Sequence, residues 1–424
     1  MRRRHLLAAV LACSCGAGCA GETSAGRDLP PAFREPVPLP GCEQFEYQSC
    51  DVRAPACLEN LAQIAACLRT GGAIAPSPPV SFVSEDEARR MLLVSLAQTP
   101  PPVPDYFELV LTQLGLSQPS AFEPAISAAR LASRWAAFYR RDVRDVVVID
   151  HASSDPGSVA RDPLGTEALV LHELIHALQD RDRDLDAFAR RYQTDSDGNF
   201  RGSSVIEGEA QLYQLRFSAA LAGVDVGSID WAAELASQRD AAEERLFAEP
   251  DRYSASLLGM PYAHGTEFVA RVWGQAGPGG VRALLETPPR DMREILAQLW
   301  GDDTAEPAKP EIESAPVDPG DAVLQTWGTL GAWGVYLFFR PRLATREEAR
   351  ALALAWRGDR LEAFSFGVGQ VAGRWWIQLA DAEAASRLAA AIGAQPGLHA
   401  RALGAQLRVL STSGDELPPR LDPE

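Results

Sequence analysis

Two histidines and a glutamate have the spacing of a metal site on one helix. The segment 168–180 reads ALVLHELIHALQD, and its HExxH pattern contains His172, Glu173 and His176. On an α-helix, residues four apart lie one above the other on the same face, so the two imidazoles can bind one ion at about 2.0–2.1 Å. Glu173 lies beside them, where its carboxylate can reach a water on the open side of the ion. The alternative is a pair of ordinary histidines on an amphipathic helix.

A third ligand is predicted at the start of a second helix, which we expect over Val205–Leu221. The first residues of that helix read VIEGEA and include Glu207 and Glu209. A catalytic zinc ion takes three protein ligands and keeps one position for water, so one carboxylate would complete the set. Glu207 is the predicted ligand, and Glu209 is predicted to support the ligands from behind or to replace Glu207. The alternative for both is a solvated first turn, where the helix dipole favours carboxylates.

Three further polar side chains are candidates for supporting roles. Asp180 falls on the same helical stripe as the histidines and is predicted to orient His176 through its second ring nitrogen. Hydrolysis of a carbonyl compound develops negative charge on oxygen, which requires hydrogen-bond donors in addition to a metal ion. Tyr262 and His264, in the segment MPYAHG, are the predicted donors. The alternative for Asp180 is a simple carboxylate in the last helical turn, and for Tyr262 it is packing.

Together, HELIHALQD and IEGEA resemble the gluzincin type of zinc metallopeptidase, and more closely a group of bacterial secreted or lipid-anchored proteins that share HELxHALQDQ and EG[DE]A. The resemblance implies that His172, His176 and Glu207 bind zinc and that Glu173 is the base. It extends over residues 125–380 or so, through FY at 138–139, PY at 261–262 with Gly265, PPR at 288–290 and GDR at 358–360. Only the two metal motifs are highly specific. Arg181 stands where these proteins usually have glutamine.

The chemistry expected from this set is hydrolysis of a peptide bond with one zinc ion as cofactor. Zinc lowers the pKa of a bound water toward about 7 and polarises a carbonyl group. Glu173 would take the proton of the water and pass it to the leaving amine. The predicted substrate is a peptide or protein lying along the strand expected at 145–150, which is predicted to be a sheet edge. The alternative is a non-catalytic zinc-binding envelope protein that binds a peptide or protein partner.

The charge balance argues against nucleic acid as a partner. The chain has 424 residues, with 40 Lys and Arg against 57 Asp and Glu, and a net charge of −17. Such a chain repels phosphates and anionic lipid headgroups unless a basic patch compensates, and its one basic run is Arg2–Arg4. The sequence also lacks the GxSxG pattern of serine hydrolases, which disfavours that class of enzyme.

The N-terminus has the layout of a secretory signal. Arg2–Arg4 precede a short apolar run, Leu6–Ala12, and small residues and cysteines follow up to position 19. VLAC at 10–13 resembles a bacterial lipobox, which predicts acylation of Cys13, with Cys19 as the second candidate and plain secretion as the alternative. We therefore expect an exported protein, either secreted or held in the periplasm or at the outer membrane. A lipid anchor is the only membrane contact expected.

Four cysteines follow the leader within a short stretch: Cys42, Cys50, Cys57 and Cys67. In an oxidising compartment this clustering favours two disulfides. Three pairings are possible, and the sequence does not select one. The alternative is a zinc site made of the four thiolates, although they lack the CxxC spacing that such sites usually have.

The predicted elements indicate an α+β protein, with a mostly helical zincin-like core that contains a small sheet, and a small C-terminal α+β unit. Around the metal motifs we expect helices over Ala125–Arg141 and Thr166–Asp182 and a strand over Asp145–Asp150. The acidic, proline-rich segment 301–320 is predicted to be a linker. The expected organisation is a signal or lipobox region (1–19), an N-terminal cysteine-containing segment (20–78), the metallopeptidase-like core (79–300), the linker (301–320) and the C-terminal unit (321–424).

Overall fold

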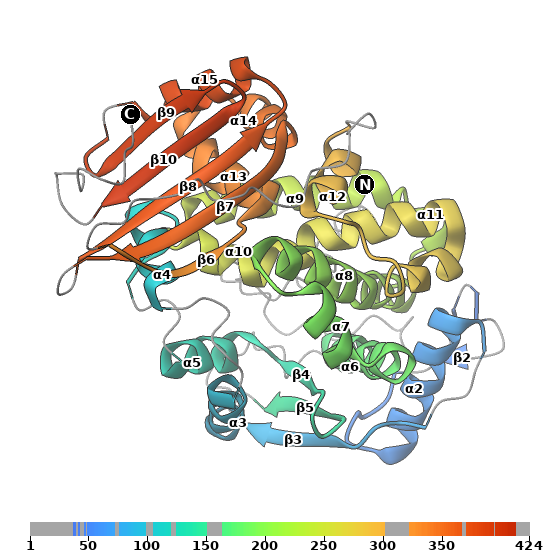
Figure 1. The fold of residues 1–424 in the computed structure, drawn as a ribbon. Coiled ribbons are helices and arrows are strands. Elements are labelled where there is room, and N and C mark those ends of the chain that lie inside the picture. Colours follow the sequence, from blue (N-terminus) through green and yellow to red (C-terminus); the bar gives the residue numbers. More distant parts are fainter. Residues whose placement is uncertain are drawn as a thin grey trace.

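Helices form most of the chain that the structure describes, and short sheets accompany them (Figure 1). This computed structural model describes residues 37–39, 41–42, 46–47, 49–72, 76–98, 105–119, 124–150, 163–301, 322–366, 370–393 and 395–412. The expected α+β class is confirmed. The predicted leader with Cys13 and Cys19, and residues 302–320 of the predicted linker, lie outside the described residues. No described helix combines the length and the apolar character needed to cross a bilayer.

The helices are α2 (Pro55–Thr70), α3 (Glu85–Gln98), α4 (Asp105–Gln113), α5 (Pro124–Arg134), α6 (Pro163–Arg183), α7 (Leu185–Tyr192), α8 (Ser196–Leu221), α9 (Trp231–Ala248), α10 (Arg252–Met260), α11 (Thr266–Ala283), α12 (Met292–Trp300), α13 (Gly331–Phe339), α14 (Arg346–Leu354) and α15 (Ala382–Ile392). A π-helical turn, Pro261–Gly265, joins α10 to α11, and single 3₁₀ turns cover Val226–Ser228 and Arg340–Arg342. The strands are β1 (Val37–Pro38), β2 (Glu46–Tyr47), β3 (Val80–Ser84), β4 (Ala137–Arg140), β5 (Asp145–Asp150), β6 (Val323–Gly328), β7 (Trp356–Ser365), β8 (Val371–Leu379), β9 (Leu398–Leu403) and β10 (Gln406–Thr412).

The small sheet next to the metal motifs has the strand order β3-β5-β4. β5 pairs in parallel with β3 and antiparallel with β4, so it is the central strand. The prediction that strand 145–150 is a sheet edge is therefore wrong. The edge strand that contacts α6 is β4.

The helix expected over Ala125–Arg141 ends early, and its last residues form β4 instead. A tight turn reverses the chain after β4, with Arg144 at a positive φ of 56°. Arg140 donates to Asp145 across this turn, with Nε and Oδ1 2.7 Å apart. The apolar residues whose spacing predicts one continuous helix are therefore divided between α5 and the hairpin of β4 and β5. Pairing with β5 determines the structure of Ala137–Arg140 more strongly than the helical periodicity does.

α6 and α8, the helices with the metal motifs, pack against each other near the middle of the molecule (Figure 1). α8 begins well before the expected Val205, because Asp195 caps it by accepting from the Gly198 amide at 2.7 Å. Farther along α8, Gly208 touches the π-helical turn so closely that a Cβ there would lie 2.5 Å from the carbonyl carbon of Gly265. The glycine between Glu207 and Glu209 therefore lets the two backbones meet.

Two disulfides tie the N-terminal segment to α2. They join Cys42 to Cys67 and Cys50 to Cys57, with Cα atoms 5.9 Å and 5.7 Å apart. Of the three pairings that the sequence left open, this is the one that the structure contains, and the four thiols do not form a zinc site. Disulfides are typical of oxidising compartments outside the cytosol.

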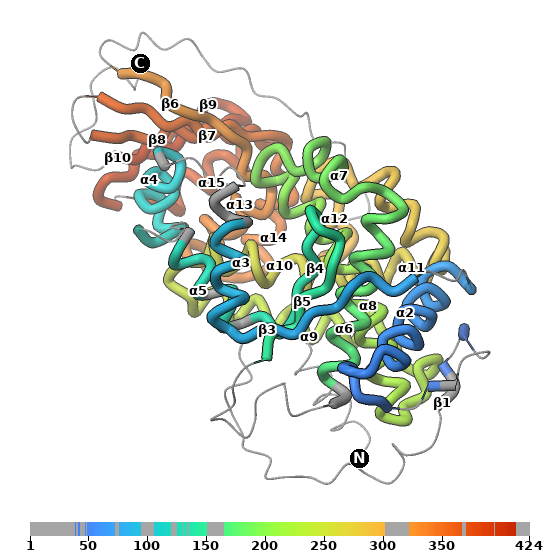
Figure 2. The backbone as a smooth tube through the Cα atoms, turned by 90° about the horizontal axis from the view of Figure 1, so that it is seen from below, coloured from blue at the N-terminus to red at the C-terminus, as the bar shows by residue number. Residues whose placement is uncertain are grey.

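The C-terminal sheet is antiparallel, with the order β6-β7-β8-β10-β9. α13 packs on it, and so does α4, which precedes the core motifs by more than fifty residues of chain. The sheet lies apart from β3-β5-β4 (Figures 1 and 2). One hydrophobic core nevertheless runs from α2 through α6 and α8 to α13 and β8, and it includes Leu61, Ile175, Phe217, Trp333 and Trp375.

The carboxylate of Asp359, in the GDR segment, ties α13 to this sheet. It accepts from the amides of Leu330 and Gly331, both at 2.9 Å, and from the indoles of Trp356 and Trp375 at 3.0 and 2.8 Å. We expect Asp359→Ala to lower the free energy of unfolding by at least about 3 kcal/mol, because four buried donors lose their acceptor. Denaturant unfolding measures this change. A loss below about 1 kcal/mol would contradict the expectation.

Candidate metal centre

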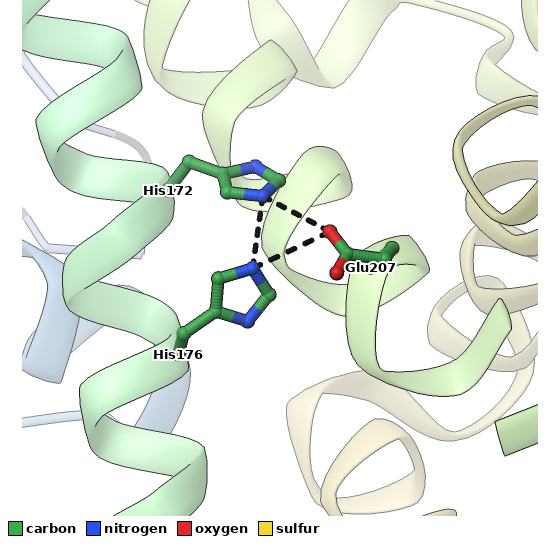
Figure 3. A group of neighbouring side chains, drawn as sticks. All are labelled: His172, His176 and Glu207. Atoms are coloured by element: carbon green, nitrogen blue, oxygen red, sulfur yellow. Dashed lines mark hydrogen bonds and ion pairs between the residues drawn. The ribbon is translucent and has the colours of Figure 1, made fainter. Parts of the chain in front are cut away.

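The two histidines of HExxH face the same point from neighbouring turns of α6 (Figure 3). His172 and His176 are both largely buried. Their Nε2 atoms lie 3.0 Å apart, and the rings meet edge to face with centroids 4.7 Å apart. The helical spacing therefore brings the two nitrogens to one position.

Glu207 reaches the same position from α8 (Figure 3). Its Oε2 lies 3.3 Å from Nε2 of His172 and 3.4 Å from Nε2 of His176. These three residues could hold a metal ion, because each offers one ligand atom to a common point. The structure thus brings together the three side chains that the sequence motifs selected.

Glu173, the neighbour of His172 on α6, interacts electrostatically with all three converging residues. Its side chain is buried, with 6% exposure. Burial raises the pKa of this carboxyl group, the two imidazoles lower it, Glu207 raises it, and the backbone amide of Tyr139 lowers it by donating a hydrogen bond. Since Tyr139 belongs to β4, the edge strand of the small sheet contacts the predicted base.

The second nitrogen of His176 contacts Gln179, not Asp180. Nδ1 of His176 lies 2.8 Å from Oε1 of Gln179. Asp180 instead accepts from the Tyr139 hydroxyl at 3.0 Å and from the Leu185 amide at 2.9 Å. The predicted role of Asp180 is wrong, because one step along a helix rotates the side chain by about 100°, here toward β4.

Glu209 lies behind the three converging residues rather than among them. Its Oε2 accepts from Nε2 of Gln179 at 2.8 Å, and its Oε1 accepts from Nε of Arg69 at 2.8 Å. The sequence motifs do not single out Gln179 or Arg69 as part of this site. Gln179 stands three residues after His176, a spacing that could have suggested the contact. Arg69 is on α2, and nothing in its local sequence pointed to the site.

Tyr262 and His264 separate in the structure. The ring of Tyr262 stacks on His172, with centroids 6.0 Å apart and an angle of 20° between the planes. His264 is 2% exposed and lies elsewhere: its Nε2 is 3.0 Å from Oε1 of Glu243, and its ring packs on Trp333. His264 is therefore not a donor at this site, since residues two apart in a helical turn point in different directions.

Comparison with known proteins assigns no family to the chain. Protein-family models, curated proteins and solved structures were searched, and none of them matches. The resemblance of the two motifs to gluzincins therefore stays a prediction. The chemistry of the site has to be argued from its own residues.

The charges of this cluster favour a protonated His176. Burial lowers the pKa of His176, but the charge and hydrogen bond of Glu207, the charge of Glu173 and the hydrogen bond to Gln179 together raise it more, and the result is a change from 6.5 to about 9. For Glu207, burial raises the pKa, and the two imidazoles lower it well below its ordinary value. Below about pH 9 a metal ion must therefore displace a proton from His176.

This competition predicts how metal affinity depends on pH. Since the imidazole must lose its proton before it binds, we expect affinity to fall as the pH falls below about 9, by up to about tenfold per pH unit. Competition titrations of Zn²⁺ against a chelator at pH 6, 7 and 8, corrected for protonation of the chelator, measure this. Equal affinity at pH 6 and pH 8 would contradict it.

Proposed function

We propose that the protein is a zinc-dependent peptidase with a zincin-like site, in which Glu173 is the general base. One observation carries this proposal: the convergence of Nε2 of His172, Nε2 of His176 and Oε2 of Glu207 beside a buried carboxylate. Two imidazoles and one carboxylate form a ligand set that catalytic zinc commonly uses, and that set keeps a fourth position open.

The spacing of the ligand atoms fits zinc. Tetrahedral ligands at about 2.0–2.1 Å from an ion are separated from one another by about 3.3–3.4 Å. The three separations in the cluster are 3.0, 3.3 and 3.4 Å. The side chains therefore need little movement to bind such an ion.

When bound, zinc supplies Lewis-acid polarisation of the scissile carbonyl and acidifies water. The chain's own residues supply the rest. Glu173 takes a proton from the attacking water and delivers it to the nitrogen of the leaving amine. Its buried position, which raises its pKa, makes it a better base than an exposed carboxylate. Tyr262, stacked on His172, is the remaining candidate donor to the developing oxyanion.

β4 is the strand along which an extended peptide would bind. Within the described residues, β4 pairs with β5 on one side and with no strand on the other. The backbone amide of Tyr139, in this strand, donates a hydrogen bond to Glu173. A peptide added to this edge would therefore lie next to the base. The proposed peptide-binding strand is thus β4, the neighbour of the strand at 145–150 that the sequence predicts for this role.

We also propose that the protein is exported from the cytoplasm. The two disulfides indicate folding in an oxidising environment. This agrees with a secretory leader at 1–19 and, within it, with Cys13 as the acylated residue. Proteins or peptides of the cell envelope or its surroundings are then the expected substrates.

A peptide-library digest tests the proposed activity. The protein is incubated with the library as purified, after removal of metal by a chelator, and after return of Zn²⁺, and the products are identified by mass spectrometry. We expect cleavage that disappears with the metal and returns with zinc. Stoichiometric zinc binding without any cleavage would favour the alternative, a non-catalytic zinc protein that binds a peptide or protein partner.

A further inference from the structure

A chain of buried hydrogen bonds runs from α2 to the ligand His176. Nε of Arg69 donates to Oε1 of Glu209 at 2.8 Å. Oε2 of the same carboxylate accepts from Nε2 of Gln179 at 2.8 Å, and Oε1 of Gln179 lies 2.8 Å from Nδ1 of His176. We call Arg69, Glu209 and Gln179 the buried relay.

The buried relay is closed to solvent. Arg69 and Glu209 are 1% exposed, and Gln179 is fully buried. Two donors of the buried relay make further hydrogen bonds inside the protein. Nε2 of Gln179 donates a second hydrogen bond to the carbonyl of Ile206 at 3.0 Å, and Nη1 of Arg69 donates to Asp182. Rearranging any member would therefore leave a buried polar group without its partner.

The direction of every bond in the buried relay is determined by chemistry. A guanidinium only donates, and an ionised carboxylate only accepts, so Arg69 and the amide nitrogen of Gln179 must both donate to Glu209. With its nitrogen turned to Glu209, Gln179 turns its oxygen to His176. This oxygen can only accept, so Nδ1 of His176 must be the donor.

We propose that the buried relay positions His176 for metal binding by holding the proton on Nδ1 and thereby leaving Nε2 as the nitrogen that binds the ion. This proposal rests on the proposed metal centre. Arg69, Glu209 and Gln179 are positioning residues, since they act through the ring of His176 and not on the ion. Arg69 lies two residues after Cys67 on α2, which a disulfide joins to Cys42. The disulfide-bonded N-terminal segment therefore helps to position the site.

Reversing the polarity of the buried relay tests the proposal. In Glu209→Gln, an amide nitrogen faces Gln179, so Gln179 is expected to turn its own nitrogen toward His176 and to favour a proton on Nε2. We expect the affinity for Zn²⁺, measured by competition with a chelator, to fall by about 10- to 100-fold. In Gln179→Glu, two carboxylates face each other, and we expect a loss of similar size.

The double variant Glu209→Gln with Gln179→Glu reverses the hydrogen bond between positions 209 and 179 but restores an acceptor at position 179 for Nδ1 of His176. The new amide nitrogen donates to the new carboxylate, which accepts from Nδ1 of His176. We expect the double variant to recover most of the affinity that each single variant loses. Recovery should be incomplete, because the carbonyl of Ile206 loses the donor that Gln179 provides. A merely structural role for these residues predicts no recovery.

Glu362→Gln is the matched control. Glu362 is as buried as Glu209 and accepts from Arg374 at 2.8 Å, but it lies in the C-terminal sheet. We expect this variant to lose stability without losing zinc affinity. Two results would contradict the proposed role of the buried relay without contradicting the metal centre. One is a Glu209→Gln variant with the zinc affinity of the wild type. The other is a double variant whose zinc affinity is no higher than that of either single variant. A wild type that binds no zinc would overturn the proposed function and the buried relay with it.

Discussion

Replacement of Glu173 by glutamine is expected to lower peptide hydrolysis by about 100- to 10 000-fold, the range that a positioned general base contributes. The amide has nearly the shape of the carboxylate but cannot take a proton. Because Glu173 is not one of the three converging residues, zinc affinity should stay close to that of the wild type. Turnover with a peptide found in the library digest, together with a zinc titration, measures both effects.

Glu167→Gln is a suitable control for this variant. Glu167 belongs to the same helix and is also buried, but it accepts from the Ser49 hydroxyl at 2.8 Å and the Cys50 amide at 2.7 Å, away from the ligands. We expect its turnover per folded molecule to match the wild type. Near-normal hydrolysis by Glu173→Gln would show that another group is the base.

Removal of Glu207 should have the largest effect on metal binding. In Glu207→Ala the two imidazoles remain, but the carboxylate that attracts the ion and completes the ligand set is lost. We expect zinc affinity to fall by more than about 100-fold, since even the loss of an outer partner costs about 10- to 100-fold.

Thermal unfolding with and without zinc measures the same loss independently. A wild type with zinc at about 100 times its dissociation constant should gain about 2.7 kcal/mol of stability, and Glu207→Ala should gain almost none at that concentration. Glu244→Ala, an exposed acid on α9, controls for the change in net charge and should keep the full gain. Equal stabilisation of Glu207→Ala and wild type would remove Glu207 from the ligand set.

The parts of the site that lie within one helix could be predicted from the sequence. His172 and His176 converge because helical geometry alone places residues four apart on one face. The pairing with Glu207 needed a second motif, and the structure explains why that motif contains a glycine: Gly208 lets α8 meet the π-helical turn that holds Tyr262.

Contacts between distant segments could not be predicted in this way. Trp135 and Phe138 fit a helical period, yet Phe138 lies in β4, because only the position of β5 decides that pairing. Arg69 reaches Glu209 across 140 positions of the chain, and no periodicity encodes such a contact. The sequence alone does not tell whether Gln179 or Asp180 contacts His176, because that depends on what lies opposite each side chain in the fold.

Metal content is the most direct test of the account. The protein is purified without an affinity tag, and its metals are quantified by plasma mass spectrometry, followed by titration of the chelator-treated protein with Zn²⁺. We expect one zinc ion per chain, or one binding site after chelation, with His172, His176 and Glu207 required for it. Protein that contains no zinc and takes up none on titration would contradict the account.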